Sequence, residues 1–487
     1  MMQRALRWYD FITINIYWLG LNMATSVITP VLLPFLVALY VPADVKNTYL
    51  ANIRVISLAV AMLVQPLAGM FSDRSISRYG RRRPYIFGGA SLNVVFLLIV
   101  GLSYSFSDLA QDGFASTAYW LLMGGIVLLQ VSSNIAHGAL QGLIPDLVPE
   151  DQRGRASGVK AVMELLPVLL VLFIGPLVDR GQIWLVIAIV AASYLITMGI
   201  TVLTVREEAL TVKPKDPIRE PILRLVALTA VFLGVTQAVV WLIRRSSDGL
   251  FAGELSQTAQ IALIGGLGLA GMAGAILIGV YLGARIGIGA GASEHSSFIW
   301  WVVNRLLFLA AIGSVQGFAQ YFLADVIGIP NAASMTTVLL GVVALFLLPS
   351  ALGSGYLADR IGRIRLVAAA GVLAALGTLL LLFAREMPMV IVAGSIIGLG
   401  GGTFMATNWA LGTDLAPKGQ AGKYLGISNL AGAGAGIIGT GIGGPMADFL
   451  NGIQPGLGYL VIFAIYAALF LLSSVVLLKV HPRGELV

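Results

Sequence analysis

The chain has 487 residues, of which 58% are hydrophobic and only 11% carry a charge. Soluble domains carry about 25% charged residues, so this composition excludes an ordinary water-soluble fold and indicates that the lipid bilayer is the solvent. The net charge of +7 is therefore interpreted as a sign of membrane topology and not of nucleic-acid binding. The sequence contains no cysteine, which excludes disulfides, thiolate catalysis and thiolate metal sites, and we expect no cofactor.

Apolar runs long enough to cross a bilayer as a helix, about 20 residues each, recur along the whole chain. They predict an all-α membrane protein with about 14 spans. The predicted spans are residues 11–39, 50–72, 84–104, 118–144, 157–178, 182–204, 221–243, 258–283, 297–323, 333–357, 365–384, 388–412, 424–447 and 456–479.

Basic residues are distributed unevenly over the loops between these spans. The loop after the second span contains a run of arginines, Arg81 to Arg83, whereas the 105–117 loop contains two aspartates and no basic residue. Lys and Arg are enriched in the cytoplasmic loops of membrane proteins. The pattern predicts a multi-pass plasma (inner) membrane protein with both termini in the cytoplasm.

Two stretches of the chain repeat the same loop motifs in the same order. Gly69-x-x-x-Asp73-Arg74 at the end of the second span matches Gly355-x-x-x-Asp359-Arg360 at the end of the tenth, and a Gly-Arg pair follows each. Matched motifs in matched order indicate two copies of a six-helix unit. We therefore predict an N-terminal half, 1–206, a linker with an inserted transmembrane hairpin, 207–295, and a C-terminal half, 296–487.

These repeated loops are expected to control access to a central site. A carboxylate at the positive N-terminus of a helix, with arginines paired to loop carboxylates, can bias one of two conformations. The alternative interpretation is that the arginines only set the topology. The candidate gating residues are Asp73, Arg74, Arg78, Gly80, Arg81, Asp146, Asp359, Arg360, Arg363 and Asp414.

The loop from Gly69 to Pro84, with Asp73-Arg74, Gly80 and three arginines before Pro84, resembles the signature loop of the major facilitator superfamily. Its long form is similar to that of the sucrose/proton symporters and of related glycoside–cation symporters. The resemblance implies the major facilitator fold, transport by alternating access, and a small-molecule substrate such as a sugar or glycoside. It also implies that the first and fourth helices of each half line the cavity.

Polar residues recur at helical spacing along those helices. They can bind a hydroxyl-rich substrate, and Trp18 and Trp409 can stack on a sugar ring or on a cation. The alternative is that these polar side chains join helices to one another. The candidate substrate-binding residues are Asn15, Trp18, Asn22, Thr25, Gln130, Asn134, Gln141, Gln316, Gln320, Thr407, Asn408 and Trp409.

Ionisable residues within membrane spans are costly to bury and mark functional sites. Glu164 lies about 12 Å into the fifth span at 1.5 Å per residue, and we expect His137 and Arg305 at similar depth. The hypothesis is that Glu164 carries the coupling proton and that His137 or Arg305 tunes it. The alternatives are a structural Glu164–Arg305 ion pair, or a Glu164 that reaches back to water.

The favoured function is proton-coupled symport of a sugar or glycoside by a monomer in contact with membrane lipids. The alternative is a proton-driven exporter or facilitator of amphiphilic compounds or lipids, which the inserted hairpin favours. An enzyme or a receptor is disfavoured, because the sequence contains no catalytic constellation, no metal cluster and no soluble domain. It also contains no Gly-x-x-x-x-Gly-Lys-Ser/Thr loop for ATP, so transport is expected to use ion gradients.

Overall fold

A computed structural model describes residues 6–107, 116–207, 218–251, 256–289, 295–416 and 421–481. Helices and short connections make up these residues, which include no strand, and the prediction of an all-α protein is confirmed. For residues 247–251, 359, 421–427 and 429–431 the backbone alone is described.

The helices of the first part of the chain are α1 (Trp8–Val27), α2 (Leu33–Tyr40), α3 (Lys46–Ser72), α4 (Arg83–Ser105), α5 (Thr117–Leu140), α6 (Leu143–Leu147), α7 (Arg153–Leu170), α8 (Gly175–Asp179) and α9 (Ile183–Thr204). The helices of the second part are α10 (Arg219–Phe251), α11 (Gln257–Gly287), α12 (Ser296–Asp325), α13 (Ala332–Ile361), α14 (Arg363–Phe383), α15 (Met387–Leu415), α16 (Ala421–Ile453) and α17 (Leu457–Val476). A π-helical turn, Ile28–Leu32, joins α1 to α2, and short 3-10 turns flank α7 and follow α17.

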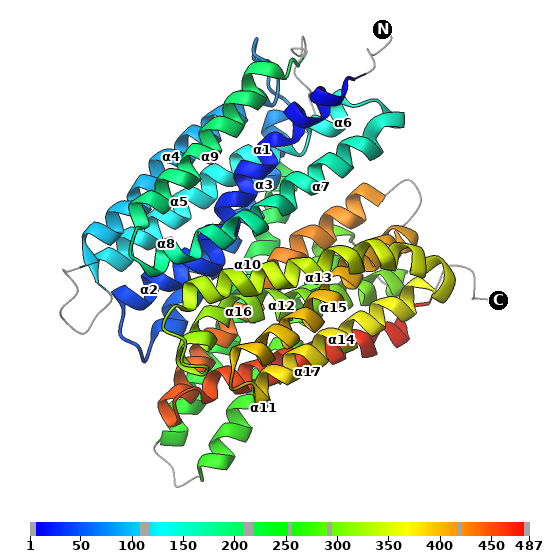
Figure 1. Ribbon diagram of the computed structural model, residues 1–487. Coiled ribbons are helices and arrows are strands. Elements are labelled where there is room, and N and C mark those ends of the chain that lie inside the picture. Colours follow the sequence, from blue (N-terminus) through cyan, green and yellow to red (C-terminus); the bar gives the residue numbers. More distant parts are fainter. Residues whose placement is uncertain are drawn as a thin grey trace. The chain divides into compact units, whose positions relative to one another are not determined.

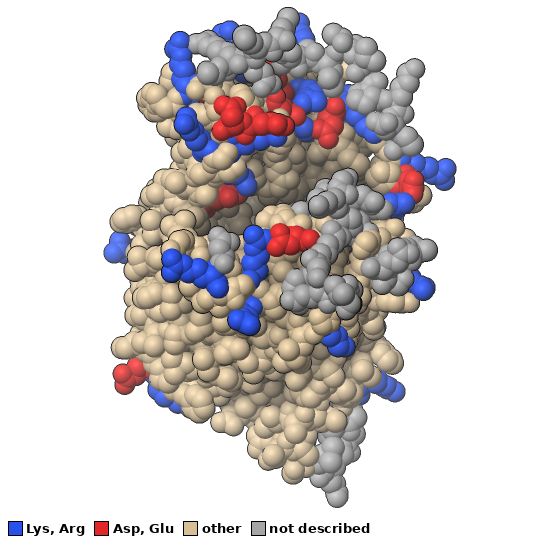
Figure 2. All heavy atoms as spheres, turned by 90° about the vertical axis from the view of Figure 1, so that its right-hand side faces the viewer, with Lys and Arg blue, Asp and Glu red and all other residues tan. Residues whose placement is uncertain are grey.

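Thirteen helical segments among the described residues are long and apolar enough to cross a membrane. The fourteenth predicted span, 424–447, lies within α16. Most of the face in Figure 2 shows no Lys, Arg, Asp or Glu side chain, as a surface in contact with lipid tails requires. The chain is therefore a multi-pass membrane protein.

The chain divides into two compact units. Figure 1 colours its helices along the sequence, from blue at the N-terminus to red at the C-terminus. The first unit contains residues 1–42 and 60–223, and the second contains 43–59 and 224–487. The helix α3 is thus shared, because its first half packs within the second unit. The inserted hairpin, α10 and α11, also belongs to the second unit, where α11 packs against α12, α16 and α17.

The two units repeat the same pattern of helix packing. In the first unit α1 packs against α7 and α9, and α4 packs against α5 and α9. In the second unit α12 packs against α16 and α17, and α14 packs against α15 and α17. The first, third, fourth, fifth and sixth membrane helices of each sequence repeat therefore have equivalent neighbours within their own unit.

Glycines allow the closest of these helix contacts. A Cβ atom at Gly138 on α5 would lie 2.3 Å from the carbonyl oxygen of Gln65 on α3. A Cβ atom at Gly317 on α12 would lie 1.7 Å from Nη1 of Arg54, whose side chain is buried. Close backbone approach through small residues is how membrane helices associate without a hydrophobic driving force.

Candidate functional site

Side chains from three helices of the first unit meet around Trp18. The Trp18 ring on α1 is 3% exposed and contacts the His137 ring of α5 edge-on, with the ring centroids 5.0 Å apart. The Nζ atom of Lys160 on α7 lies 4.1 Å from the centre of the Trp18 ring. One turn later, Glu164 forms an ion pair with Lys160 at 3.1 Å, and Gln141 contacts Nε2 of His137 at 3.2 Å. We call these five residues the Trp18 cluster.

Four of the five residues in the cluster were predicted, Trp18 and Gln141 for substrate binding and His137 and Glu164 for proton coupling, and the fifth, Lys160, was missed. Glu164 joins the cluster through its ion pair with Lys160, and His137 joins it through its ring contact with Trp18. Lys160 was missed, although its position four residues before Glu164 on one helix is a typical ion-pair spacing. Both members of the pair are about one-third exposed.

The remaining polar residues predicted for the first unit mostly bond within it. The Asn15 side chain is fully buried and donates to the carbonyl oxygens of Phe11 and Ala156, so it joins α1 to α7. Asn134 is buried and donates to both oxygens of Gln130. The other two residues bond one turn back along α1, Asn22 to Trp18 and Thr25 to Leu21. For Asn15 this geometry supports the alternative role in helix association.

A second group of side chains gathers around Arg305 in the second unit. The Arg305 guanidinium on α12 lies 5.1 Å from the centre of the Trp409 ring and 5.9 Å from that of Trp301. Its Nη1 donates to Oδ1 of Asn408 at 3.2 Å. Asn408 in turn donates to Asn304 at 2.7 Å, and Asn304 donates to the carbonyl oxygen of Ser473. We call Trp301, Asn304, Arg305, Asn408 and Trp409 the Arg305 cluster.

Sequence reasoning identified three members of this cluster and missed Trp301 and Asn304. Both are fully buried, and Trp301 Nε1 donates to the backbone carbonyl of Asn408 at 3.0 Å. Among the other predictions for this unit, Thr407 bonds to Thr403 within α15, Gln316 is exposed, and Gln320 is buried.

The repeated loop of the first unit is held by one buried arginine. Arg82, whose side chain is 7% exposed, pairs with Asp73 at the end of α3 and with Asp146 on α6 at 3.0 Å. It also donates to Ser72 at 2.6 Å, while Arg81 pairs with Asp146 at 2.7 Å. Of the predicted gating residues, Asp73, Arg81 and Asp146 thus meet, and the central Arg82 was missed.

Two further features fix this loop. Glu207 accepts hydrogen bonds from the backbone amides of Arg82 and Arg83, at 2.7 and 3.0 Å. Gly80 adopts φ of 101°, a left-handed conformation that glycine tolerates. The predicted residue Arg78 is exposed, and its side-chain contacts among the described residues are with its neighbour Tyr79.

The second copy of the loop repeats one of these contacts. Arg363, which follows Gly362 as Arg81 follows Gly80, pairs with Asp414 and donates to the carbonyl oxygen of Ala410 at 3.2 Å. Gly362 also has positive φ, at 94°. Arg360 stacks on Tyr356 in the preceding turn. The side chain of Asp359 lies outside the described residues.

A polar network that sequence reasoning missed anchors the start of α3 within the second unit. Asp448 near the end of α16 accepts hydrogen bonds from the backbone amides of Asn47 and Thr48, at 3.1 and 2.6 Å, and from the Asn47 side chain at 2.8 Å. A carboxylate is stabilised at a helix N-terminus by the unpaired amides and the helix dipole. This cap explains why the first half of α3 packs with the second unit.

The same network continues to a second carboxylate. Tyr459 at the start of α17 donates to Asp325 at 2.6 Å, and Lys46 forms an ion pair with Asp325 at 2.7 Å. Nζ of Lys46 also lies 4.7 Å from the centre of the Tyr321 ring. In the sequence, Gly444-Pro445…Asp448 repeats Gly175-Pro176…Asp179; this similarity marks Asp448 as part of the repeat but does not predict its contact with α3.

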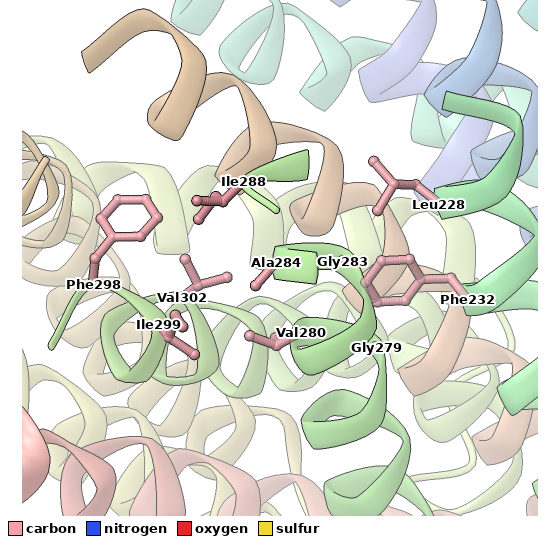
Figure 3. Close-up of a pocket in the computed structure, with 10 residues that line it drawn as sticks. All are labelled: Leu228, Phe232, Gly279, Val280, Gly283, Ala284, Ile288, Phe298, Ile299 and Val302. Carbon is pink, nitrogen blue, oxygen red and sulfur yellow. The ribbon is translucent and has the colours of Figure 1, made fainter. Parts of the chain in front are cut away.

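A small pocket of about 20 Å³ lies between the inserted hairpin and α12 (Figure 3). Leu228 and Phe232 on α10 line it together with small residues of α11 and with Phe298 and Val302 of α12. Its lining side chains are all apolar or glycine, so this pocket offers a sugar no hydrogen-bonding side chain. None of the predicted site residues lines it.

Comparison with known proteins identifies the family. The sequence matches the profile of the Major Facilitator Superfamily over residues 19–440 and 306–486. A sucrose transport protein of Arabidopsis thaliana, SUC3, is 33% identical over 107 residues, which are 20% of this chain and 18% of that protein. A general alpha-glucoside permease of Schizosaccharomyces pombe is 27% identical over 210 residues, 40% of this chain and 37% of that protein. The chain thus aligns with about a fifth to a little over a third of these relatives' lengths.

Solved structures show the same fold. A D-xylose-proton symporter matches with a TM-score of 0.61 and 14% identity, covering 98% of this chain and 99% of the other. A POT family transporter in complex with 5-aminolevulinic acid matches with a TM-score of 0.64 and 15% identity, covering 96% and 95%. The helix packing, the paired loop motifs and the family match over most of the sequence lead to one conclusion: this chain is a transporter of the Major Facilitator Superfamily.

Proposed function

We propose that this transporter couples the entry of a sugar or glycoside to the entry of a proton, by alternating access. The observation that carries the proposal is the Trp18 cluster, in which a titratable carboxylate, Glu164, lies one contact away from an aromatic ring. Aromatic faces bind the apolar faces of sugar rings, and neighbouring polar groups bind hydroxyls. The partial similarity to sucrose and alpha-glucoside carriers supports the same substrate class.

The cluster suggests how a proton and a sugar are coupled. In the observed arrangement, the Glu164 carboxylate holds Lys160, whose ammonium group covers one face of Trp18. When a proton binds to Glu164, the ion pair with Lys160 is lost, and the ammonium is free to leave the ring for water. The Trp18 face then becomes available to the substrate, so that proton binding precedes sugar binding. His137 and Gln141 supply the hydrogen-bonding edge of this site.

The loop ion pairs are proposed to control the conformational change. Asp73, Asp146 and Asp414 each pair with an arginine. These contacts favour the conformation in which they form, and their loss favours another. We propose that the basic loops face the cytoplasm, as both termini do, in the plasma (inner) membrane. Because the chain has no cysteine, a single Ser77→Cys variant tests this directly: an impermeant thiol reagent should label it in inside-out vesicles and not in intact cells.

The coupling proposal is tested in proteoliposomes with a labelled disaccharide such as sucrose or maltose. An inward proton gradient should accelerate uptake by the wild type. Glu164→Gln should abolish this acceleration and retain sugar exchange at zero gradient, because the neutral side chain mimics the protonated state. Glu150→Gln is the matched control, since Glu150 is 89% exposed and lies just before the same helix. Full gradient-driven uptake by Glu164→Gln would refute the role of Glu164.

One observation favours a second candidate function, the transport of amphiphilic compounds. The pocket of Figure 3 is apolar and adjoins the inserted hairpin, which is the kind of surface that accepts an alkyl chain. Proton-driven export of a fluorescent amphiphilic cation from vesicles, without uptake of any sugar, would establish this function. Val302→Trp, which narrows the pocket, should then reduce export. Under the symport proposal, the same substitution should leave sugar uptake unchanged.

A further inference from the structure

Arg305 is a buried positive charge whose hydrogen-bonding capacity is largely unused. It lies about 14 Å along α12 from the start of that helix at Ser296, at 1.5 Å per residue. Among the described residues, Arg305 donates one hydrogen bond, to Asn408, and its Nε is buried without a partner. A guanidinium has five N–H donors. Within the described residues of the second unit, no carboxylate forms an ion pair with it.

The described side chains around the Arg305 guanidinium position it through neutral contacts that leave its positive charge uncompensated. Asn304 is fixed by its bond to the Ser473 carbonyl, and it orients the Asn408 amide so that its oxygen faces Arg305. Trp301 and Trp409 offer ring faces to the cation. Cation–π contacts and one neutral acceptor recover only part of what an arginine loses on leaving water. A site of this kind is pre-organised for an anion.

We propose that Arg305 binds an anionic oxygen group of the transported substrate, so that the substrate is an acidic sugar or glycoside carrying a carboxylate or a phosphate. The planar fork of arginine matches both groups in a bidentate geometry. Trp409 lies beside the guanidinium and can stack on the sugar ring to which the group is attached. This inference rests on the proposed sugar transport and narrows its substrate class. It gives Arg305 a role in binding the charged group of the substrate, in place of the predicted role in proton coupling.

The Arg305 cluster has a counterpart in the first sequence repeat, the Trp18 cluster, and comparing the two supports the role of Arg305 in anion binding. Trp409 precedes Asp414 by five residues, as Gln141 precedes Asp146. In the first unit the matching cluster contains an acid, Glu164, which pairs with Lys160. Among the described residues of the second unit, no acid pairs with Arg305. The two clusters therefore differ in charge: the Trp18 cluster pairs an acid with a base, whereas the described contacts of the Arg305 cluster join a cation to neutral groups.

The test measures binding of three matched ligands to the purified full-length protein by thermal stabilisation. They are methyl α-glucoside, its C6 carboxylate counterpart methyl α-glucuronoside, and glucose 6-phosphate. The wild type should bind at least one acidic ligand about tenfold or more tightly than the neutral one, as expected for an added charge-assisted hydrogen bond. A preference for the carboxylate or for the phosphate identifies which group the substrate carries.

Variants then locate the preference. Arg305→Gln should remove the preference for acidic ligands and change the affinity for methyl α-glucoside by no more than about threefold. Arg305→Lys should retain part of the preference, because the positive charge remains. Arg385→Gln is the control, since Arg385 is exposed and donates only to the preceding carbonyl. If Arg305→Gln does not fold, the wild-type ligand series alone decides.

Two outcomes would overturn the inference, and they differ from failure of the sugar proposal. Equal wild-type affinity for neutral and acidic ligands refutes the anion site while leaving sugar transport intact. Retention of the acidic preference in Arg305→Gln refutes the role of this residue. Absence of binding by all three ligands, together with binding of amphiphiles, refutes the proposed function itself.

Discussion

Replacing Arg82 with methionine should destabilise the protein by about 2–3 kcal/mol. Removing one partner of a buried ion pair costs about 3–5 kcal/mol, and Arg82 is 7% exposed with two carboxylate partners. Two features reduce the cost. Asp146 keeps Arg81 as a partner at 2.7 Å, and Asp73 is 53% exposed, so water solvates it. Methionine fills the space of the stem without adding a charge.

The loop itself should remain anchored in this variant. Glu207 binds the backbone amides of residues 82 and 83, and these bonds do not depend on the side chain. The measurement is equilibrium unfolding in detergent, with the midpoint temperature as a second readout. At about 2–4 °C per kcal/mol for a unit of this size, the midpoint should fall by roughly 4–12 °C. Arg78→Met is the control, because Arg78 is exposed and its side-chain contacts among the described residues are with Tyr79.

Double-mutant cycles divide the effect between the two carboxylates. Arg82 and Asp146 should couple by about 1.5–3 kcal/mol, as a partly buried charged hydrogen bond does. Arg82 and Asp73 should couple by less than about 1 kcal/mol, since the aspartate is half-exposed and screened. Coupling to Asp73 that equals or exceeds coupling to Asp146 would refute this reasoning, as would an Arg78→Met loss as large as that of Arg82→Met.

Two further substitutions test the packing of the second unit. Asp448→Asn should lower the unfolding free energy by about 1–2 kcal/mol, because one acceptor facing the amides at the start of α3 becomes an NH₂ group; an unchanged unfolding curve would show that the cap is dispensable. Gly412→Ala should cost about 1–3 kcal/mol, because its Cβ would lie 2.1 Å from the Trp301 ring; a fluorescence-monitored melt matching the wild type would show that the ring can move.

The arrangement of helices could be predicted from the sequence because two independent signals agree. Hydropathy predicted the spans, and the repeated Asp-Arg and Gly-Arg motifs predicted two copies of a six-helix unit. The division of α3 between the units could not be predicted. It depends on Asp448, which caps α3 from a position 400 residues away from Thr48 along the chain, and hydropathy carries no information about such a contact.

The candidate sites were predicted less completely than the fold. Helical spacing placed Trp18, His137 and Glu164 correctly on helices that meet, because residues three and four apart share a face. It could not distinguish residues that face a neighbouring helix from those that face a ligand, as Asn15 shows by its bond to the Ala156 carbonyl. Buried residues such as Asn304 were missed because a single amide within an apolar run gives no periodic signal.

The two copies of the signature loop are not equivalent, and the difference follows from one position. Gly80-Arg81-Arg82-Arg83 in the first copy aligns with Gly362-Arg363-Ile364-Arg365 in the second, so isoleucine stands where Arg82 would be. Among the side chains that the structure describes, the second loop has the Arg363–Asp414 pair, whose members are 34% and 57% exposed, and such pairs contribute at most about 1 kcal/mol. If both loops contributed equally to one conformation, their ion pairs would have to stabilise it by similar free energies. The unequal contacts instead concentrate the free energy of the closed loop in the first unit, where proton binding is proposed to occur.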